Sequence, residues 1–177
     1  TISGEPYRFP SRDECIRCHS SNFNRPLAFL PGQMNRDGQL KKFHGLGIVD
    51  DVFVEIAKAQ PLTDPLDETQ PIELRARSWI HSNCSHCHKV SGGSGLTAQM
   101  NTAVPTSSME LINFQPNKGY FGLEGAPQID PGNPYNSILY YRIATRAAGH
   151  MPMFGARTLV KSGVQIIHDW IRSMDPL

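Results

Sequence analysis

Apolar side chains recur at helical spacing in three segments of the chain. Residues 73–87 begin with an acidic first turn just after a proline, and their shared face is made by Trp79, Ile80, Asn83 and Cys87. Residues 137–144 have the apolar spacing of a helix of two to three turns. Near the end of the chain, Ser162-Gly163-Val164-Gln165 has the form of a capping box, and helical spacing follows at Val164, Ile167, Trp170, Ile171 and Met174. These patterns predict three helices.

The remaining segments have the composition of connections. Residues 91–134 are rich in Gly, Pro, Ser and Asn, and such length without periodicity predicts a loop that wraps around something. Residues 61–71 hold three prolines and predict a linker. Since no hairpin signal or regular strand spacing occurs, the expected fold class is all-α with long loops. The expected domains are residues 1–60, a short first domain, and residues 72–177, a second domain.

Composition and charge exclude several classes of protein. The chain has 177 residues, of which 39% are hydrophobic and 19% charged, as in a soluble globular protein. Its 17 basic and 16 acidic residues are nearly balanced, so no nucleic-acid partner is expected. No apolar stretch approaches the roughly 18 residues of a membrane span, so none is expected in this chain. Because the chain lacks an initiator Met, we interpret it as a processed product or a piece of a longer protein.

The four cysteines fall in two copies of one motif, and this is the most informative feature of the sequence. The copies are Cys15-Ile16-Arg17-Cys18-His19 and Cys84-Ser85-His86-Cys87-His88. C-x-x-C-H is the covalent attachment site of c-type haem. The two thiols add to the two vinyl groups of one porphyrin, and the following imidazole becomes the proximal ligand of the iron. The sequence therefore predicts two covalently bound haem c groups.

Three alternatives explain part of this pattern. Two C-x-x-C pairs can bind zinc, but zinc needs no His after each pair, and the 65 residues between Cys18 and Cys84 exceed the usual zinc-ribbon spacing of roughly 15–20. Two disulfides are possible in an exported domain. A thioredoxin-like redox pair explains only one motif and needs a βαβ context that the pattern lacks. The repeated His favours haem over all three.

With these motifs in place, residues 71–177 resemble a class I cytochrome c. They contain a helix leading into C-x-x-C-H, a Gly/Pro-rich loop, a Met-Pro segment and a closing helix. The resemblance implies that Met151, which precedes a proline, is the sixth ligand of the second iron. The whole chain is similar to a dihaem cytochrome region at the C-terminal end of larger exported bacterial proteins, on account of Gln33-Met34-Asn35-Arg36-Asp37 and Pro131-Gly132-Asn133-Pro134 in addition to both haem motifs.

The sequence predicts both axial ligands of the second haem iron, whereas for the first it leaves several candidates for the sixth ligand. For the second haem, His88 and Met151 are the expected pair, and Met153 is the competing sulfur. Three other histidines of this half, His81, His86 and His150, are interpreted as loop or propionate-region residues.

For the first haem, His19 is the proximal ligand by the motif. The order of haem motif, Met loop and helix recurs there, with Met34 in the loop and residues 39–44 as the helix. Met34 is therefore the expected sixth ligand. His44 and an open site are the alternatives.

The expected function is one-electron transfer by an exported, periplasmic dihaem cytochrome c that is not itself an enzyme. A haem iron with both axial positions filled cannot bind a substrate, but it can pass electrons through the exposed haem edge. The expected partners are a redox protein donor and acceptor, one of which can be a dehydrogenase domain of a larger parent. The alternative is a haem enzyme or a sensor of peroxide or nitric oxide, with an open first iron and an acid or base from Arg36, Asp37 or His44.

Overall fold

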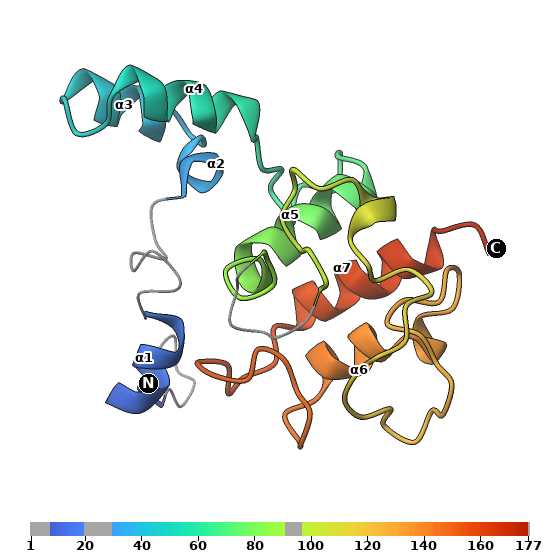
Figure 1. Cartoon of the computed structure of the whole chain (residues 1–177). Helices are drawn as coiled ribbons and strands as arrows, with labels where there is room; N and C mark the ends of the chain where they lie inside the picture. The colour runs from blue at the N-terminus through green and yellow to red at the C-terminus, as the bar shows by residue number, and fades with distance from the viewer. Residues whose placement is uncertain (1–7, 20–29, 91–96, 177) are drawn as a thin grey trace.

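The described part of the protein is built from helices joined by long loops (Figure 1). The computed structural model describes residues 8–19, 30–90 and 97–176. Its helices are α1 (Arg12–Cys18), α2 (Pro31–Met34), α3 (Gln39–Gly45), α4 (Asp51–Ala59), α5 (Ile72–Cys84), η2 (Thr106–Ser108), η3 (Pro134–Asn136), α6 (Ile138–Ala144) and α7 (Lys161–Arg172). Within these ranges an isolated bridge joins Ile112 and Ile129, and no strand is present. The all-α prediction is confirmed for the described residues, none of whose helices is long and apolar enough to cross a bilayer.

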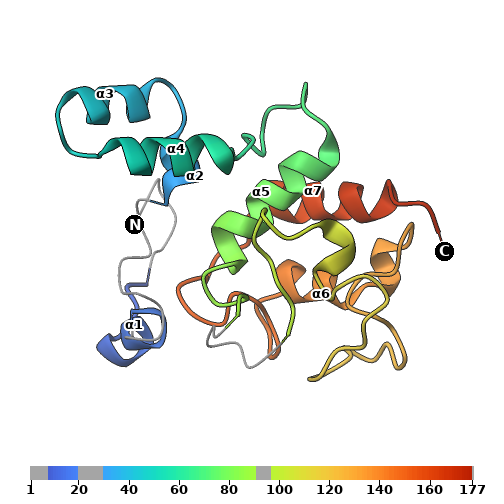
Figure 2. The ribbon, with the colours of Figure 1, turned by 45° about the horizontal axis from the view of Figure 1, so that its top comes forward.

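Helices α5 and α7 lie against each other at the centre of the larger hydrophobic cluster (Figures 1 and 2). Ile80 of α5 and Ile167, Trp170 and Ile171 of α7 are at most 2% exposed. The helices come together where Gly163 faces Trp79, since a Cβ on Gly163 would lie closer than 3.0 Å to the indole ring. The periodic faces of two predicted helices thus make the core.

The long loop before α6 also contributes to this core. Met109, Leu111 and Ile129 are at most 1% exposed. Two backbone bonds hold the loop to itself: the N–H of Ile129 donates to Leu111 (3.0 Å), and the N–H of Asn113 donates to Ile129 (2.9 Å). The predicted loop is therefore found over the described residues 97–134, interrupted by short 3-10 turns, while residues 91–96 lie outside the described part.

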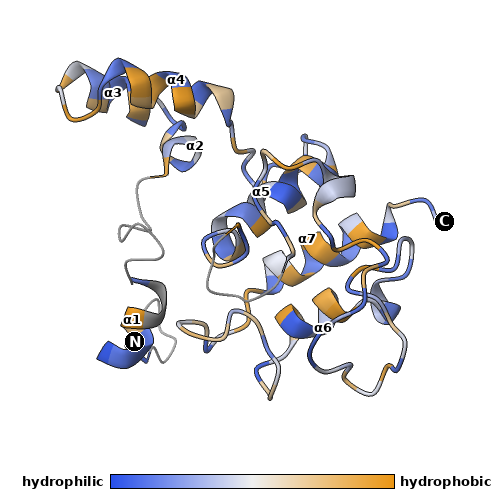
Figure 3. Ribbon diagram, viewed as in Figure 1, coloured by the Kyte–Doolittle hydropathy of each residue, from blue (hydrophilic) through white to orange (hydrophobic). Residues whose placement is uncertain are grey.

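A second, smaller hydrophobic cluster lies among α2, α3 and α4. Its buried members are Met34, Leu40 and Ala57, and side chains such as Phe53 pack around them. Helix α4 was not predicted from the sequence; its N-cap is Asp50, whose carboxylate accepts the N–H of Phe53 (2.8 Å). Figure 3 shows apolar and polar positions intermixed along α3 and α4, and the two helices contact each other.

Helix α1 stands apart from α2–α4 in both views (Figures 1 and 2). Its N-terminus is closed by a capping box, in which Ser11 Oγ accepts the N–H of Glu14 (3.3 Å) and the Glu14 carboxylate accepts the N–H of Ser11 (2.7 Å). Arg8 pairs with the same carboxylate (2.8 Å). That guanidinium, followed by the bond from Ser11, lowers the pKa of Glu14 to about 2. A seven-residue helix is thus fixed by local contacts.

Residues 61–71 connect the two clusters and are fastened to α5. The N–H of Thr63 donates to Ser78 Oγ (2.9 Å), and Nε of Arg75 donates to the carbonyl of Pro65 (2.8 Å). The larger cluster draws its residues from positions 72–174 and the smaller one from positions 34–57. The boundaries at 60 and 72 stay a prediction, and the two clusters lie on either side of the predicted linker.

Three local predictions differ from the structure. Helix α5 ends at Cys84, so the second C-x-x-C-H motif follows the helix instead of completing it. The capping box predicted at Ser162 is wrong: α7 begins at Lys161, its N-cap is Val160, and no side chain caps it. The segment with Met34, expected as a loop, is the single helical turn α2, because Pro31 occupies the first helical position.

Candidate functional site

The backbone forms the same kind of turn in both C-x-x-C-H motifs. In the first, the N–H of His19 donates to the carbonyl of Cys15 (2.8 Å); in the second, the N–H of His88 donates to the carbonyl of Cys84 (2.9 Å). The first turn is the last of α1, and the second follows α5 directly. In each motif the histidine therefore lies one helical turn beyond the first cysteine, and the second cysteine lies between them on that turn.

The second motif is packed against the core. Cys84 is half-buried and contacts the larger hydrophobic cluster. Burial, followed by the neighbouring thiol of Cys87, raises the pKa of the Cys84 thiol to about 12. The N–H of Met100 donates to the carbonyl of His88 (2.9 Å), which fixes the chain just before the long loop enters the core. The second motif is thus held at its first residue by packing of Cys84 and at its last residue by the backbone bond to His88.

One ring nitrogen of His88, Nδ1, has no hydrogen-bond partner among the described residues. The residue is 8% exposed, and its Nδ1 is buried with no hydrogen-bond partner among the described residues. Burial, followed by the charges of His86 and Arg142, lowers the pKa of His88, which favours the neutral ring. A neutral imidazole is the form that binds a metal. This buried, unsatisfied ring fits the proximal-ligand role that the motif predicts.

Met151 is positioned by Arg142. The N–H of Met151 donates to the backbone carbonyl of Arg142 (2.7 Å), and Nη1 of the Arg142 guanidinium donates to the carbonyl of Gly149 (2.9 Å). The guanidinium also bonds the carbonyl of Lys118 and lies over the ring of Phe121, 5.6 Å from its centroid. Since the charge of Arg142 also acts on the pKa of His88, this residue connects the surroundings of both predicted ligands.

The competing sulfur, Met153, differs from Met151 in exposure. Met153 is 61% exposed, whereas Met151 is half-buried. A thioether that ligates an iron has to be withdrawn from water into the protein, so burial favours Met151 over its neighbour. Met151 remains the predicted ligand.

The first motif is more exposed than the second. The side chain of Cys15 is exposed, and His19 is the exposed C-cap of α1, while the side chain of Cys18 lies outside the described part. The thiols of Cys15 and Cys84 are free, which gives the two-disulfide alternative no support. Among the described residues, no three His, Cys, Asp or Glu side chains gather into a metal site.

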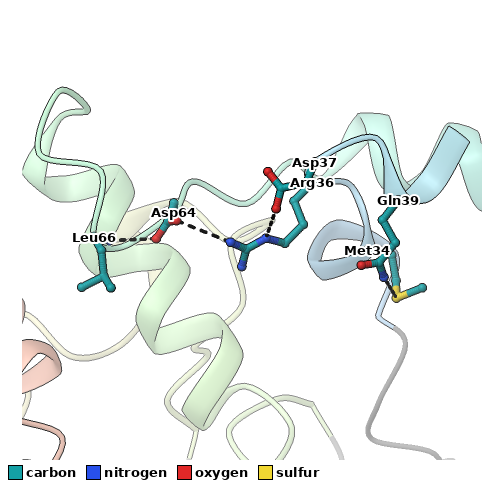
Figure 4. Close-up of polar contacts among 6 residues, drawn as sticks. All are labelled: Met34, Arg36, Asp37, Gln39, Asp64 and Leu66. Carbon is teal, nitrogen blue, oxygen red and sulfur yellow. Dashed lines mark hydrogen bonds and ion pairs between the residues drawn. The ribbon is translucent and has the colours of Figure 1, made fainter. Parts of the chain in front are cut away.

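The candidates for the sixth position of the first iron lie on α2 and α3, where they have other partners (Figure 4). Met34 is 7% exposed, and its sulfur accepts a hydrogen bond from Nε2 of Gln39 (3.3 Å). Nε2 of His44 is 2.8 Å from Oδ1 of Asp51. Arg36 forms ion pairs with Asp37 (3.2 Å) and Asp64 (3.6 Å). The structure brings none of these side chains into a described contact with α1.

Sequence reasoning missed the basic residues around the Met-Pro segment. Arg142 is a helix residue with no motif of its own, and Arg146 follows α6. Their roles depend on carbonyls distant in the chain: Arg142 reaches Lys118, and Nη2 of Arg146 reaches Thr158 (3.0 Å). A sequence signal exists only in the Arg-x-x-x-Arg spacing next to the predicted ligand, which is common on helices. The sequence interpretation of His150 is a loop or propionate-region residue.

Comparison with protein-family models, with curated proteins and with solved structures found no match for this chain.

Proposed function

We propose that this chain is a dihaem c-type cytochrome that transfers single electrons between exported redox partners. The observation that carries the proposal is that Cys15–His19 and Cys84–His88 form equivalent turns. In each turn, the backbone N–H of the histidine donates to the carbonyl of the first cysteine. Two thiols and an imidazole on one turn are what attachment and proximal ligation of a haem require. A structural zinc or disulfide role gives no reason for this turn to occur twice with a histidine at its end.

In the second site, Cys84 and Cys87 would hold the porphyrin, and His88 and Met151 would hold the iron. Haem c supplies one-electron redox chemistry when bound. The chain supplies a neutral, buried imidazole at His88 and a segment at Met151 that Arg142 fastens at two points. With both axial positions filled by protein, substrate is kept from the iron. This arrangement suits electron transfer and not turnover of a small molecule.

In the first site, Cys15 and Cys18 would hold the porphyrin, and His19 would be the proximal ligand. Met34 is the sixth ligand that the sequence predicts, but its sulfur belongs to the α2–α4 cluster and is bonded to Gln39. The acid or base residues that the enzyme or gas-sensor alternative requires, Arg36, Asp37 and His44, are engaged in ion pairs or in a bond to Asp51. No observation favours that alternative.

The proposed setting is the periplasm or another exported compartment, because covalent haem attachment and cysteine pairs of this kind belong to proteins matured outside the cytoplasm. The partners would be a redox protein donor and acceptor. A dehydrogenase domain of a larger parent chain is one such donor, and it would leave the chemistry of both sites unchanged.

Intact mass under denaturing conditions tests the proposal. The purified protein should exceed the mass of the polypeptide by two haem groups. Cys15→Ala with Cys18→Ala should remove one haem, and Cys84→Ala with Cys87→Ala should remove the other. Ser85→Ala, between the second pair, is the matched control and should keep both. A polypeptide with two disulfides and no haem would refute the proposal.

A further inference from the structure

A hollow of about 300 Å³ lies between the N-terminal segment that includes α1 and the segment that contains the Met-Pro pair. It brings together residues far apart in the sequence, since one wall comes from positions 8 and 14 and the other from positions 146–157. The residues that matter for its chemistry are Arg8, Glu14, Arg146, His150, Met153 and Arg157. The hollow therefore connects the helix of the first haem motif to the second half of the chain.

Two side-chain atoms of residues that line this hollow lack a hydrogen-bond partner among the described residues. Nδ1 of His150 and Nε of Arg146 are both buried and form no hydrogen bond among the described residues. The described part of the chain has four such side-chain atoms, and a third is Nδ1 of the predicted ligand His88. A buried polar atom without a partner costs about 1–3 kcal/mol, so groups of this kind point to a ligand that satisfies them.

The charges around the hollow suit an anionic group. Arg8, Arg146 and Arg157 line it with three guanidinium groups, and Glu14 is the carboxylate that lines it. Glu14 is already paired with Arg8 at 2.8 Å. Arg146 and Arg157 therefore have no carboxylate among the described residues of the hollow to neutralise their charges. A haem carries two propionate groups, which this positive charge would attract.

The hollow adjoins the first motif and not the second. Cys15 follows Glu14 directly in α1, and His19 is the C-cap of the same helix. His19 follows Glu14 by five positions, a rise of about 7.5 Å along a helix, so the proximal histidine lies within about two turns of this wall. Met151, the predicted ligand of the second iron, does not line the hollow, although its neighbours His150 and Met153 do.

We propose that His150 is the sixth ligand of the first haem iron, opposite His19. The inference rests on the proposed function and adds a ligand from the second half of the chain to the haem attached in the first. His150 lines the hollow, is half-buried and has a ring nitrogen, Nδ1, with no hydrogen-bond partner among the described residues, whereas the sulfur of Met34 is bonded to Gln39 and Met153 is 61% exposed. Adjacent residues 150 and 151 would then serve the two irons, which keeps the haems close enough for rapid electron exchange.

Two histidines on the first iron and a His/Met pair on the second would give the haems different potentials. A thioether stabilises the ferrous state more than an imidazole does, so the first haem would have the lower potential. An electron shared by the two haems would therefore reside mainly on the second haem before it passes to the acceptor.

The test uses the full chain with both haems attached. In the wild-type protein, both haems should be low-spin by electron paramagnetic resonance, and carbon monoxide should bind slowly. His150→Gly should keep two haems by intact mass but convert one to high spin, which then binds carbon monoxide rapidly. Added imidazole should restore the low-spin signal, because it fills the space that the side chain leaves. Met34→Leu and Met153→Leu are the matched controls and should leave both haems low-spin.

A second variant covers the case in which His150→Gly does not fold. His150→Met should keep both haems low-spin, add a second near-infrared sulfur-to-iron band and raise the lower of the two potentials. The inference is overturned if a folded His150→Gly keeps both haems low-spin, if Met34→Leu or Met153→Leu produces the high-spin haem instead, if His150→Met adds no sulfur band, or if one wild-type haem is already high-spin. A wild-type mass without two haems would refute the proposed function itself, so the two failures are distinguishable.

Discussion

The indole ring of Trp79 lies so close to Gly163 that a Cβ on the glycine would come within 3.0 Å of it. Trp79 is on α5 and Gly163 is in the first turn of α7, so this contact sets how closely the two central helices approach. Glycine is a poor helix former, and its presence inside α7 is explained by the ring that occupies the space of a side chain.

Gly163→Ala should therefore destabilise the protein although alanine favours helices. The methyl group meets a rigid ring, at a cost of about 1–3 kcal/mol, while the gain in helix propensity is about 1 kcal/mol. Denaturant unfolding should show a net loss of up to about 2 kcal/mol. Ser162→Ala, the exposed neighbour, should change stability by less than about 0.5 kcal/mol, since it caps nothing. In a Trp79→Leu background the alanine should cost less, and an equal cost in both backgrounds would contradict the contact.

Met151→Leu should remove the near-infrared sulfur-to-iron band of the second haem and lower its potential, because leucine has a similar volume but no sulfur to donate. Met153→Leu is the control and should leave the band in place. If Met153→Leu removes the band and Met151→Leu does not, the other sulfur is the ligand.

Arg142→Gln should loosen the segment that carries Met151 without removing a ligand. The variant loses the hydrogen bonds from the guanidinium to the carbonyls of Gly149 and Lys118, each worth about 0.5–1.5 kcal/mol in a typical case. Carbon monoxide should therefore displace Met151 from the ferrous haem severalfold faster, as measured by flow-mixing spectroscopy. Arg172→Gln, an exposed arginine in the last turn of α7, should bind at the wild-type rate. Equal rates in both variants would show that Arg142 does not restrain the ligand.

His81 should make the free energy of unfolding depend on pH. Its Nδ1 accepts the N–H of Thr102 (3.1 Å), and burial, followed by the charge of Arg77, lowers the pKa of His81 below its usual value. The unfolded chain then binds the proton first as the pH falls, so the stabilisation is complete above about pH 6.5 and is lost progressively below it.

Unfolding of the haem-loaded protein by denaturant between pH 8 and pH 5 measures this effect. His81→Asn keeps an acceptor near the Thr102 N–H but has no titrating ring, so its stability should fall less between pH 7 and pH 5 than that of the wild type. Ser82→Ala, an exposed neighbour on α5, should keep the wild-type slope. The same slope in His81→Asn as in the wild type would assign the effect to other groups.

Strong periodicity explains which helices could be predicted. Helices α5, α6 and α7 each place apolar residues at repeated helical spacing, and all three are present. The end of α5 was placed three residues too late because a C-x-x-C-H turn has the same spacing as a helix. The capping box at Ser162 misled for a related reason, since Ser-x-x-Gln spacing also occurs inside a helical turn. Helix α4 was missed, although Asp50 before an apolar run is a regular start signal.

The motif cysteines and histidines could be predicted because their chemistry is local in the chain. The contacts around them could not, because they depend on segments that meet only in the fold. Arg142 joins carbonyls before and after it, and the hollow beside His150 has walls more than 130 residues apart. Such contacts leave no periodic signal in a single sequence.

Helices α5 and α7 are the first and last helices of the larger cluster, and each covers the other. A chain that is exported with its N-terminus first delivers α5 and the second cysteine motif to the exported compartment before α7. Until α7 emerges, the apolar surface against which Cys84 packs is incomplete. We therefore expect the Cys84 thiol to be accessible for attachment until α7 docks and completes the larger cluster.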